Sequence, residues 1–575
     1  MSAEQFITEH LDLWTGAVTT KSTGGRGSQN GIELTGIKKL RELIADLAVR
    51  GKLLQQEPTD ESASNLAIKI AAEREQLVKT GAIKRLKRLP QIDVADQPYC
   101  LPPNWAWIRL GEATNYGITE KAEPNDVSGE TWVLELEDIE KESSRLVKKI
   151  RQDQRPFKSS KNRFQKNDVL YGKLRPYLDK VVVADECGVC TTEIVPLRGF
   201  YGLAPDYLQL ALKSPAFKNY ANSSTHGMNL PRLGTDKARL ALLPLPPENE
   251  QHRIVQKVDE LMALCDRLEQ QTRDQHAAHE TLVDSLLETL TQSNDADELS
   301  ENWARLAAHF DMLFTTEQSI ERLKQTILQL GIMGRIAKQS ANDEPASVLF
   351  KNINTNNIKN KSLPDITSNE KQFKIPNNWL WVKFGHINTL INGDRSKNYP
   401  NRDEYVREGL PWINTGHIQK DGTLSKSNMN FITEEKFNHL KSGKIRTNDL
   451  VYCLRGATLG KTASVSPYST GAIASSLMIV RPHIPAMQRY IFYYLISPFG
   501  RDQIARFNNG SAQPNLSANS VALYAFPLPP LREQKRIVKR IDELFSFCDQ
   551  LKARLLQVSK TRWRTADAVV EQAIH

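Results

Sequence analysis

The sequence predicts an α+β protein with two globular blocks joined by long α-helices. Its 575 residues, 40% of them hydrophobic and 25% charged, are enough for several soluble domains, each with its own core. Strand-like and helix-like segments alternate within the blocks. A long repeat, offset by 283 residues, shows that one design is used twice.

Composition excludes several classes of protein. No apolar run approaches the roughly 18 residues that a membrane span needs. The first residues, MSAEQFITEHLD, are acidic and lack an apolar run, so we expect no secretory signal. Six scattered cysteines are not a disulfide framework and suit a reducing cytoplasm.

Two pairs of segments define the repeat. LPLPPENEQHRIVQKVDELMALCDRLEQQ, from Leu243, matches FPLPPLREQKRIVKRIDELFSFCDQLKAR, from Phe526. GIKKLRELIADLAVRGKLLQQ matches QSIERLKQTILQLGIMGRIAKQ, which places Gly51 and Gly334 at the same offset of 283. HLDLW and HFDMLF are 299 residues apart, so the first copy has 16 extra residues, which we assign to the flexible stretch around KSTGGRGSQNG.

Between these anchors the two copies diverge. Trp105 and Trp379 differ by 274 positions, and Asp168 and Asp449 differ by 281. The segments HGMNLPRLG and NGSAQPNLS return to the offset of 283. Similar flanks around dissimilar interiors indicate one scaffold that presents two different binding surfaces.

Heptad spacing predicts the long helices. A helix over 248–290 would be about 65 Å long. We expect it to pair with its counterpart in the other copy as an antiparallel coiled-coil spacer; the alternative is that each helix packs on its own domain. The first seam is Ile254, Val258, Leu261, Cys265 and Leu268, interrupted by Thr272, Gln275 and His279 before Leu282 and Leu286; the second is Ile537, Ile541, Leu544, Cys548, Leu551, Leu555 and Val558.

Within the blocks, β-branched and aromatic segments predict strands at TWVLEL, DVLYG, KVVVA, TTEIVPL, DLVYCL and SSLMIV. The segments PDYLQLALKSPAFKNYAN and AMQRYIFYYLISPFGRDQIARF predict helices. The Asn-rich stretch from Ser340 to Lys374 is expected to be irregular. Its counterpart, ESASNLAIKIAAEREQLVKTG, predicts an extra helix that would account for the shift in offset from 283 to 274.

The predicted organisation has seven parts. They are an N-terminal helical region (1–56), a linker with a helix (57–100), a first block (101–247), a central helical region (248–339), an Asn-rich linker (340–375), a second block (376–530) and a C-terminal helix (531–575).

The positive charge is concentrated in two places. The chain has a net charge of +9, which alone says little about partners. Residues 141–180 hold 13 basic and 4 acidic side chains, and residues 376–530 hold 17 and 9. Two basic segments, one in each copy, favour two contacts with an anionic partner.

Catalytic and cofactor motifs do not explain the chain. RGATLGKT has three residues between its glycines instead of the four of a phosphate-binding loop. CGVC has zinc or redox spacing but no second ligand pair. All Pro-Pro pairs follow leucine, so the Asn/Asp-Pro-Pro-aromatic loop of adenine methyltransferases is absent. We therefore expect no catalytic residue, metal or cofactor in this chain.

A DNA-binding pattern remains. In both copies a strand ending in Tyr171 or Tyr452 leads into Leu-Arg and then Leu-x-Lys, and a Gly- and Pro-containing loop offers amide side chains. Arginine binds guanine or phosphate with two hydrogen bonds, and Asn and Gln bind adenine in the same way. The alternative is solvated charge with Asn side chains that cap their own turns. The candidate DNA-binding residues are Lys173, Arg175, Lys180, His226, Asn229, Arg232, Arg455, Lys461, Asn509, Gln513 and Asn515.

These motifs resemble a known family. The doubled PLPPxxEQxRIV…DEL…CDxL signature, NDLVYCLRGATLGK, NGSAQPNLS and HFDMLFTTEQSIERLKQTILQLGIMG are similar to the specificity subunit of type I restriction–modification enzymes. The resemblance covers nearly the whole chain and is strongest to the subfamily with extended conserved regions. GKLRPYLDK in the first block departs from the usual form.

The resemblance implies a non-catalytic subunit of a cytoplasmic, prokaryotic complex. Target-recognition domains at 101–247 and 376–530 would each read half of a split, asymmetric DNA sequence, and the helices would set the spacer between the halves. Two methyltransferase subunits would bring S-adenosylmethionine, and restriction subunits would bring ATP and Mg²⁺. Two alternatives stay open: a degenerate fused methyltransferase–nuclease, and an architectural protein that binds DNA without sequence preference.

Overall fold

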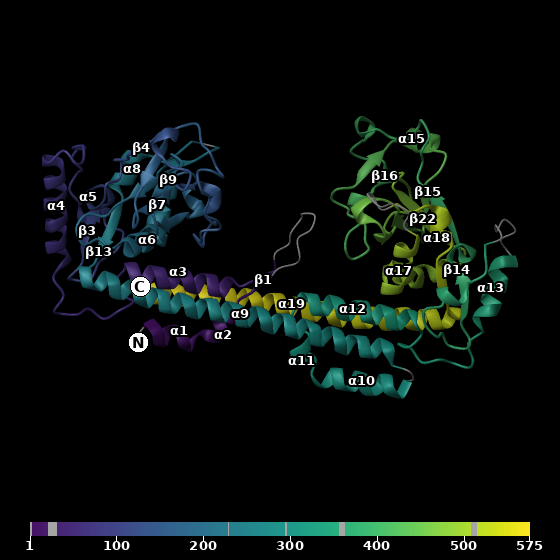
Figure 1. Ribbon diagram of the computed structural model, residues 1–575. Coiled ribbons are helices and arrows are strands. Elements are labelled where there is room, and N and C mark those ends of the chain that lie inside the picture. Colours follow the sequence, from purple (N-terminus) through teal and green to yellow (C-terminus); the bar gives the residue numbers. More distant parts are fainter. Residues whose placement is uncertain are drawn as a thin grey trace. The chain divides into compact units, whose positions relative to one another are not determined.

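The computed structural model describes residues 3–20, 32–227, 229–293, 296–355, 363–507 and 515–574 (Figure 1). The chain divides into two compact units. Unit 1 comprises Met1–Gln275 with Val558–His575, and unit 2 comprises His276–Gln557.

Unit 1 begins with short helices and continues into the first block. The sheets of this block have the strand orders β4-β6-β9-β5, β10-β7-β8, β13-β3 and β11-β12. The helices are α1 (Ala3–Glu9), α2 (Leu11–Gly16), α3 (Thr35–Val49), α4 (Ala63–Lys79), α5 (Leu110–Ala113), α6 (Pro205–Lys213), α7 (Pro215–Ser223), α8 (Thr235–Leu240) and the first part of α9 (Glu248–Gln292), which continues into unit 2. The strands are β1 (Thr19–Thr20), β2 (Ile32–Glu33), β3 (Ala106–Arg109), β4 (Lys121–Ala122), β5 (Trp132–Leu134), β6 (Lys161–Phe164), β7 (Val169–Gly172), β8 (Val181–Val183), β9 (Gly188–Cys190), β10 (Ile194–Leu197), β11 (Thr225–His226), β12 (Arg232–Leu233) and β13 (Leu242–Leu245).

Unit 2 has a related but larger block. Its sheets have the orders β17-β16-β21-β18, β15-β22-β19-β20 and β14-β23. The helices are α10 (Ala296–Ala308), α11 (Phe310–Leu313), α12 (Glu317–Ile332), α13 (Ala346–Thr355), α14 (Phe384–Ile387), α15 (Glu434–His439), α16 (Gln488–Ile496), α17 (Pro498–Phe507), α18 (Ala518–Ala522) and α19 (Leu531–Ile574), whose residues from Val558 onward belong to unit 1. The strands are β14 (Leu380–Lys383), β15 (Asn388–Asn392), β16 (Leu410–Ile413), β17 (Asn430–Ile432), β18 (Lys444–Arg446), β19 (Leu450–Cys453), β20 (Thr462–Ser464), β21 (Thr470–Ile473), β22 (Leu477–Pro482) and β23 (Ala525–Leu528).

All six predicted strand segments contain strands, namely β5, β7, β8, β10, β19 and β22. The two helical segments of the blocks form helices, but each divides into two. The breaks fall at Ser214-Pro215 and Ser497-Pro498, where α7 and α17 begin. The hydroxyl of Ser214 accepts a hydrogen bond from the amide of Phe217, so it caps α7, and proline suits the first helical position.

The prediction for the Asn-rich linker is wrong in part, because α13 lies within it. Ala346, Leu349 and Ile353 are buried along one face of this helix, at spacings of three and four. Ala346 lies 283 residues after Ala63, the first residue of α4. The helix of the first copy is therefore not extra, and the offset changes between these helices and the tryptophans that follow them. The glycine-containing segment 21–31, to which the 16 extra residues were assigned, lies outside the described residues.

Half of the predicted seam residues are buried, each set within its own unit, and most of the others are half-buried. Ile254, Leu261 and Cys265 of α9 share a core with α3 and with Ala566 of α19 in unit 1. Ile537, Ile541 and Cys548 of α19 share a core with α12 and with the last turns of α9 in unit 2. Where the first seam was predicted to resume, Leu282 is exposed, and the buried residues are instead Val283 and Leu287. At the end of the second seam, Val558 is also exposed.

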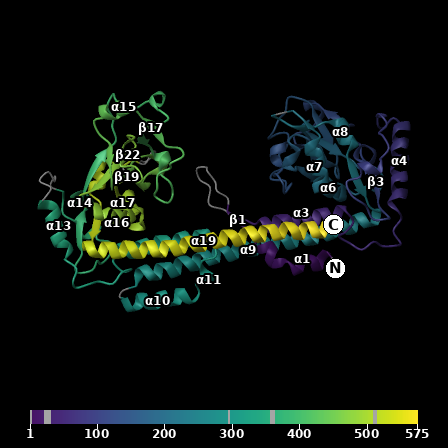
Figure 2. The same ribbon diagram turned by 180° about the vertical axis from the view of Figure 1, so that it is seen from behind.

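The two anchor glycines end equivalent helices. Gly51 follows α3 with φ +69°, and Gly334 follows α12 with φ +76°, a left-handed conformation that favours glycine. A Cβ atom on Gly51 would lie 2.4 Å from Pro102, and one on Gly334 would lie 2.7 Å from Pro376. These glycines let each block lie directly against the end of its short helix. Figure 2 shows the first of these helices, α3, from behind.

Candidate nucleic-acid interface

In the first block, the end of β7 lies beside the predicted loop. The amide of Arg175 donates a hydrogen bond to the carbonyl of Pro231 (2.7 Å), and the amide of Leu233 donates one to the carbonyl of Lys173 (3.0 Å). Leu174 and Arg232 form an isolated antiparallel bridge. The structure thus joins two segments that are 56 to 60 residues apart in the sequence.

The second block has the same junction. Arg455, just after β19, forms an isolated antiparallel bridge with Asn515. The amide of Leu516 donates a hydrogen bond to the carbonyl of Leu454 (2.9 Å). Of the candidate residues in this loop, Asn509 and Gln513 lie outside the described residues.

The backbone changes the correspondence between the two arginines. Arg455 occupies the bridge position that Leu174 has in the first block. Arg175 corresponds instead to Gly456, and both have positive φ, +52° and +75°. Arg175 and Arg455, paired in the sequence comparison, are therefore one position apart in the structure. Arg175 is left-handed, which is uncommon for arginine, whereas Arg455 is extended with φ −144°, so the two side chains leave the backbone in different directions.

The candidate side chains differ in availability. Arg175, His226, Asn229, Arg455, Lys461 and Asn515 are exposed, and Lys173 is half-buried. Two candidates are engaged inside the first block. The ammonium of Lys180 donates to the carbonyl of Leu136 (2.6 Å), and partial burial lowers its pKa. The guanidinium of Arg232 forms an ion pair with Glu193 (2.9 Å).

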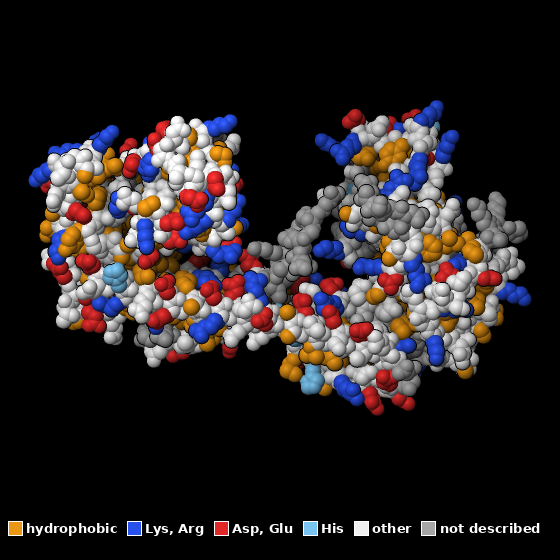
Figure 3. Space-filling model, viewed as in Figure 1, with side chains coloured by type: hydrophobic (Ala, Val, Ile, Leu, Met, Phe, Trp, Pro, Cys, Tyr) orange, Lys and Arg blue, Asp and Glu red, His pale blue; other side chains and the backbone are white. Residues whose placement is uncertain are grey.

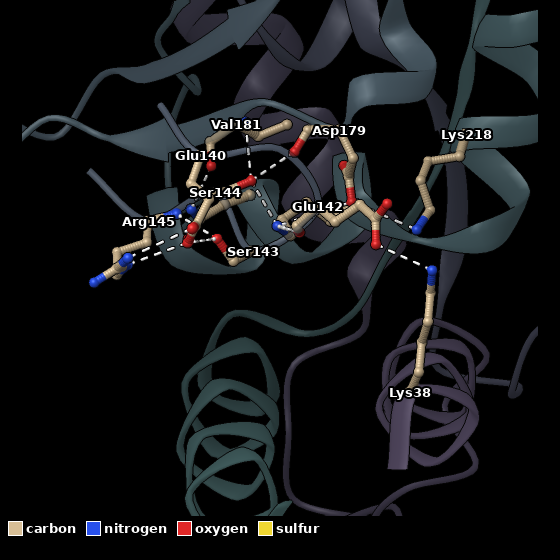
Figure 4. A network of polar contacts seen from close by, with 11 residues as sticks. Lys38, Glu140, Glu142, Ser143, Ser144, Arg145, Asp179, Val181 and Lys218 are labelled. Carbon is tan, nitrogen blue, oxygen red and sulfur yellow. Dashed lines mark hydrogen bonds and ion pairs between the residues drawn. The ribbon is translucent and has the colours of Figure 1, made fainter. Parts of the chain in front are cut away.

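The turn that carries Arg175 is fastened by a polar network (Figure 4). Ser144 donates to the carbonyl of Asp179 (2.7 Å) and accepts from the amide of Val181 (3.1 Å) and the ammonium of Lys213 (2.6 Å). The carboxylate of Asp179 pairs with Lys218 (3.4 Å), and burial raises the pKa of Asp179. The network extends to α3, where Lys38 pairs with Glu142 (3.0 Å). These contacts link the turn and the segment beside it to α6, α7 and α3.

Sequence reasoning missed an ion pair of a buried carboxylate at the start of each of the two strands β7 and β19. Asp168 is 2% exposed and binds Arg198 through two hydrogen bonds of 2.8 and 2.9 Å. Asp449 is 1% exposed and binds Arg481 in the same way, at 2.8 and 2.7 Å. Each carboxylate also accepts a backbone amide three residues before it, at the turn that begins β7 or β19. The signal was present, because both aspartates follow asparagine in the two copies.

The duplicated EQ signature has a structural role. Glu250, near the start of α9, accepts hydrogen bonds from the indole of Trp105 (3.0 Å) and the amide of Gln56 (2.7 Å). Glu533, near the start of α19, accepts one from Gln339 (2.5 Å). Both glutamates are buried, at 1% and 0% exposure, and burial raises the pKa of each. The hydrogen bonds of these glutamates thus hold the start of α9 in unit 1 and the start of α19 in unit 2.

These glutamates predict a pH dependence of stability. Because the pKa of each is raised by folding, the native state binds more protons than the unfolded state above the ordinary glutamate pKa. Their contribution to stability is therefore complete at acidic pH and is lost as pH rises through the native pKa values. We expect Glu250→Gln with Glu533→Gln to flatten the pH dependence of the urea midpoint above about pH 5. An unchanged pH dependence in the double variant would contradict this assignment.

The charge of the two blocks differs more than the sequence windows indicate. Of the 13 basic residues in 141–180, seven form ion pairs, most with acids elsewhere in the first block. Of the 17 in 376–530, four do so among the described residues. Over its full length, 101–247, the first block has 21 basic and 18 acidic side chains, a surplus of 3. Figure 3 shows blue and red side chains interleaved on the first block and several separate blue ones around the outer part of the second, near α15.

The two related α+β blocks each have an exposed arginine at a strand end that bridges to a second segment, at Arg232 or Asn515. This repeated arrangement defines a duplicated recognition protein. The described residues contain no group of three or more His, Cys, Asp or Glu placed to hold a metal ion. In the same residues, no helix has the length and apolar character that a bilayer span requires.

Comparison with known proteins identifies the family. Residues 376–559 match the family described as "Type I restriction modification DNA specificity domain". The chain is 35% identical to the EcoAI specificity subunit of Escherichia coli and 34% identical to the EcoEI specificity subunit of the same organism. Each alignment covers 100% of this chain and 100% of the relative. It therefore belongs to the specificity subunits of type I restriction enzymes, the non-catalytic subunits that recognise the DNA target.

A solved structure supports the fold. A chain described as "Structural basis underlying complex assembly and conformational transition of the type I R-M system" has a TM-score of 0.50 with this protein at 21% identity. The similarity covers 83% of this chain and 99% of that one. The mixed helix and strand architecture is thus shared with a type I system.

Proposed function

We propose that this protein reads a bipartite, asymmetric DNA sequence, one half with each block. The observation that carries the proposal is the repeated junction, in which the end of β7 or β19 is joined by backbone hydrogen bonds to the segment around Arg232 or Asn515. The two junctions carry different side chains, so the two half-sites differ in sequence. Exposed Arg175, Asn229, Arg455 and Asn515 have the donors and acceptors that base edges require.

In this proposal, α9 and α19 pair as an antiparallel coiled coil that sets the spacing of the half-sites. Each helix is 45 or 44 residues long, about 65 Å, and each contributes buried residues to both cores. The helical regions also dock two methyltransferase subunits and the restriction subunits. Those partners supply S-adenosylmethionine, ATP and Mg²⁺, and the complex works in the prokaryotic cytoplasm.

The test is to map methylated adenines in DNA from cells that express this chain with its methyltransferase subunits. We expect one split motif with two different halves and a constant unspecified spacer. Competition by random duplex against the mapped target then measures the ratio of affinities, which is the measure of specificity. Methylation without a shared motif, or equal competition by random DNA, would refute the proposal.

A further inference from the structure

One end of the four-stranded sheet in the second block carries more than Arg455. The end of β15, the start of β22 and the end of β19 meet there, because both neighbours run antiparallel to β22. The amide of Gly393, after β15, donates to the carbonyl of Leu477 (3.2 Å), and the amide of Leu454, after β19, donates to the carbonyl of Ser476 (2.9 Å). The chain segment after β15 therefore starts about two strand spacings, roughly 10 Å, from the predicted reading junction.

This segment, 393–400, is fastened to a second loop, 439–443. Asp394 is 1% exposed and accepts hydrogen bonds from the amides of Lys441 (2.6 Å) and Ser442 (3.1 Å). Ser442 also donates to the carbonyl of Asn392 (2.8 Å), and Asn398 donates to that of His439 (2.8 Å). Burial acts to raise the pKa of the Asp394 carboxyl, but the hydrogen bonds that the carboxylate accepts act more strongly in the opposite direction, so the pKa is lowered overall. The two loops are thus held together as one unit around a carboxylate.

Three cations project from this pair of loops. Arg395, Lys397 and Lys441 are exposed, and their side chains form no ion pair or hydrogen bond with any residue that the structure describes. Positive charges grouped on one surface attract an anionic polymer. Because the two loops are already held together, their backbone loses little conformational freedom when the polymer binds. We call Arg395, Lys397 and Lys441 the basic loop cluster.

Among its described residues, the first block has no strand that corresponds to β15. Its corresponding sheet, β10-β7-β8, has three strands, and the segment at the place of β15 makes only an isolated bridge between Thr114 and Gly199. The cations of this block are largely paired; for example, Lys149 pairs with Asp185 (2.7 Å) and Arg151 with Glu186 (2.8 Å). The difference between the blocks is therefore one of topology as well as of charge.

We propose that the basic loop cluster binds the DNA phosphates beside the half-site read by the second block, and that this block is the main electrostatic anchor of the protein on DNA. The proposal rests on the proposed function, because it needs DNA as the partner. Phosphate contacts carry no sequence information but supply affinity that depends on salt. The first block then contributes to recognition with a smaller electrostatic share.

The experiment measures binding of the full chain, in complex with its methyltransferase subunits, to a random-sequence duplex over a NaCl titration. R395Q/K397Q/K441Q is expected to reduce the slope of log K against log salt by about 2 to 3, since each phosphate contact contributes about 0.9. Affinity at 0.1 M NaCl is expected to fall on the order of 10²-fold. The matched control, K149Q/R151Q/R163Q, removes the same charge from paired cations of the first block and is expected to change the slope by less than about 1.

The Asp394→Asn substitution distinguishes the effect of holding the two loops together from the effect of net charge on DNA binding. The substitution makes the protein more positive, so an effect of net charge alone would strengthen DNA binding. Because it weakens the junction of the two loops, we expect weaker binding and a smaller slope, with urea unfolding showing that the block remains folded. A wild-type slope in the triple variant, or an equal loss in the control variant, would overturn the proposal.

The outcome of the salt titration is independent of the outcome of the test of the proposed function. The salt titration uses random DNA, whereas the proposed function depends on preference for a mapped target. If the complex shows no such preference, the proposed function fails while the slopes still decide whether the cluster contacts phosphates. If the preference is present but the slopes are unchanged, only the anchor is refuted.

Discussion

Asp449→Ala is expected to lower the free energy of unfolding of unit 2 by about 3–5 kcal/mol, because it leaves Arg481 without its buried partner. The carboxylate also accepts the amide of Arg446 (2.7 Å) at the turn before β19, so the same change releases the strand that leads to Arg455. Urea unfolding followed by tryptophan fluorescence measures the loss. A loss of binding at one half-site should accompany it.

The first block offers a matched comparison. Asp168→Ala breaks the equivalent pair, but the Arg198 side chain is 49% exposed, against 22% for Arg481, and is solvated more easily when its partner is removed. We therefore expect a smaller loss, about 2 kcal/mol, in unit 1. Equal losses in the two variants, or a loss below about 1 kcal/mol for Asp449→Ala, would show that these pairs do not stabilise the blocks as the geometry indicates.

Arg455→Ala and Gln513→Ala are each expected to reduce discrimination at one half-site by about 1–3 kcal/mol, if each side chain makes two hydrogen bonds to a base. Arg455 is exposed at the end of β19, and Gln513 belongs to the loop segment beyond the described residues. The measurement is the affinity for the mapped target and for targets with single substitutions in each half. Relaxed preference should appear in one half only.

Arg175→Ala is the informative companion variant. Since Arg175 corresponds to Gly456 and not to Arg455, its loss should relax the other half-site, at a different base position relative to the spacer. The contrary result would be that the Arg455→Ala and Gln513→Ala variants both bind every substituted target with the wild-type pattern across a salt titration. These side chains would then not read bases.

Local pattern was enough to predict much of the fold. The heptad spacing of Ile537, Ile541 and Cys548 predicted a long helix with a buried seam, and these residues are buried in α19. Alternation and β-branched residues predicted strands such as β7 and β19, which lead into the candidate interface. Such signals are local, because periodicity within about ten residues decides which side of an element is apolar.

Local pattern was insufficient where a residue's role depends on a distant partner. Lys180 and Arg232 look like free cations in the sequence, but they contact Leu136 and Glu193. The positive segment 141–180 is largely neutralised by acids from the rest of the first block. Helix α13 was missed because its asparagines obscured the spacing of Ala346, Leu349 and Ile353.

The sequence by itself determined that the chain is one design used twice, with similar helical flanks around two dissimilar α+β blocks, and it identified the family. The tertiary structure alone decided which cations are available, how the two arginines correspond, and what the EQ signature does. Gln56 and Glu250, for example, are 194 residues apart yet form a hydrogen bond. The reason is physical: repeats and periods are properties of neighbouring residues, whereas burial and charge pairing arise only when folding brings distant residues together.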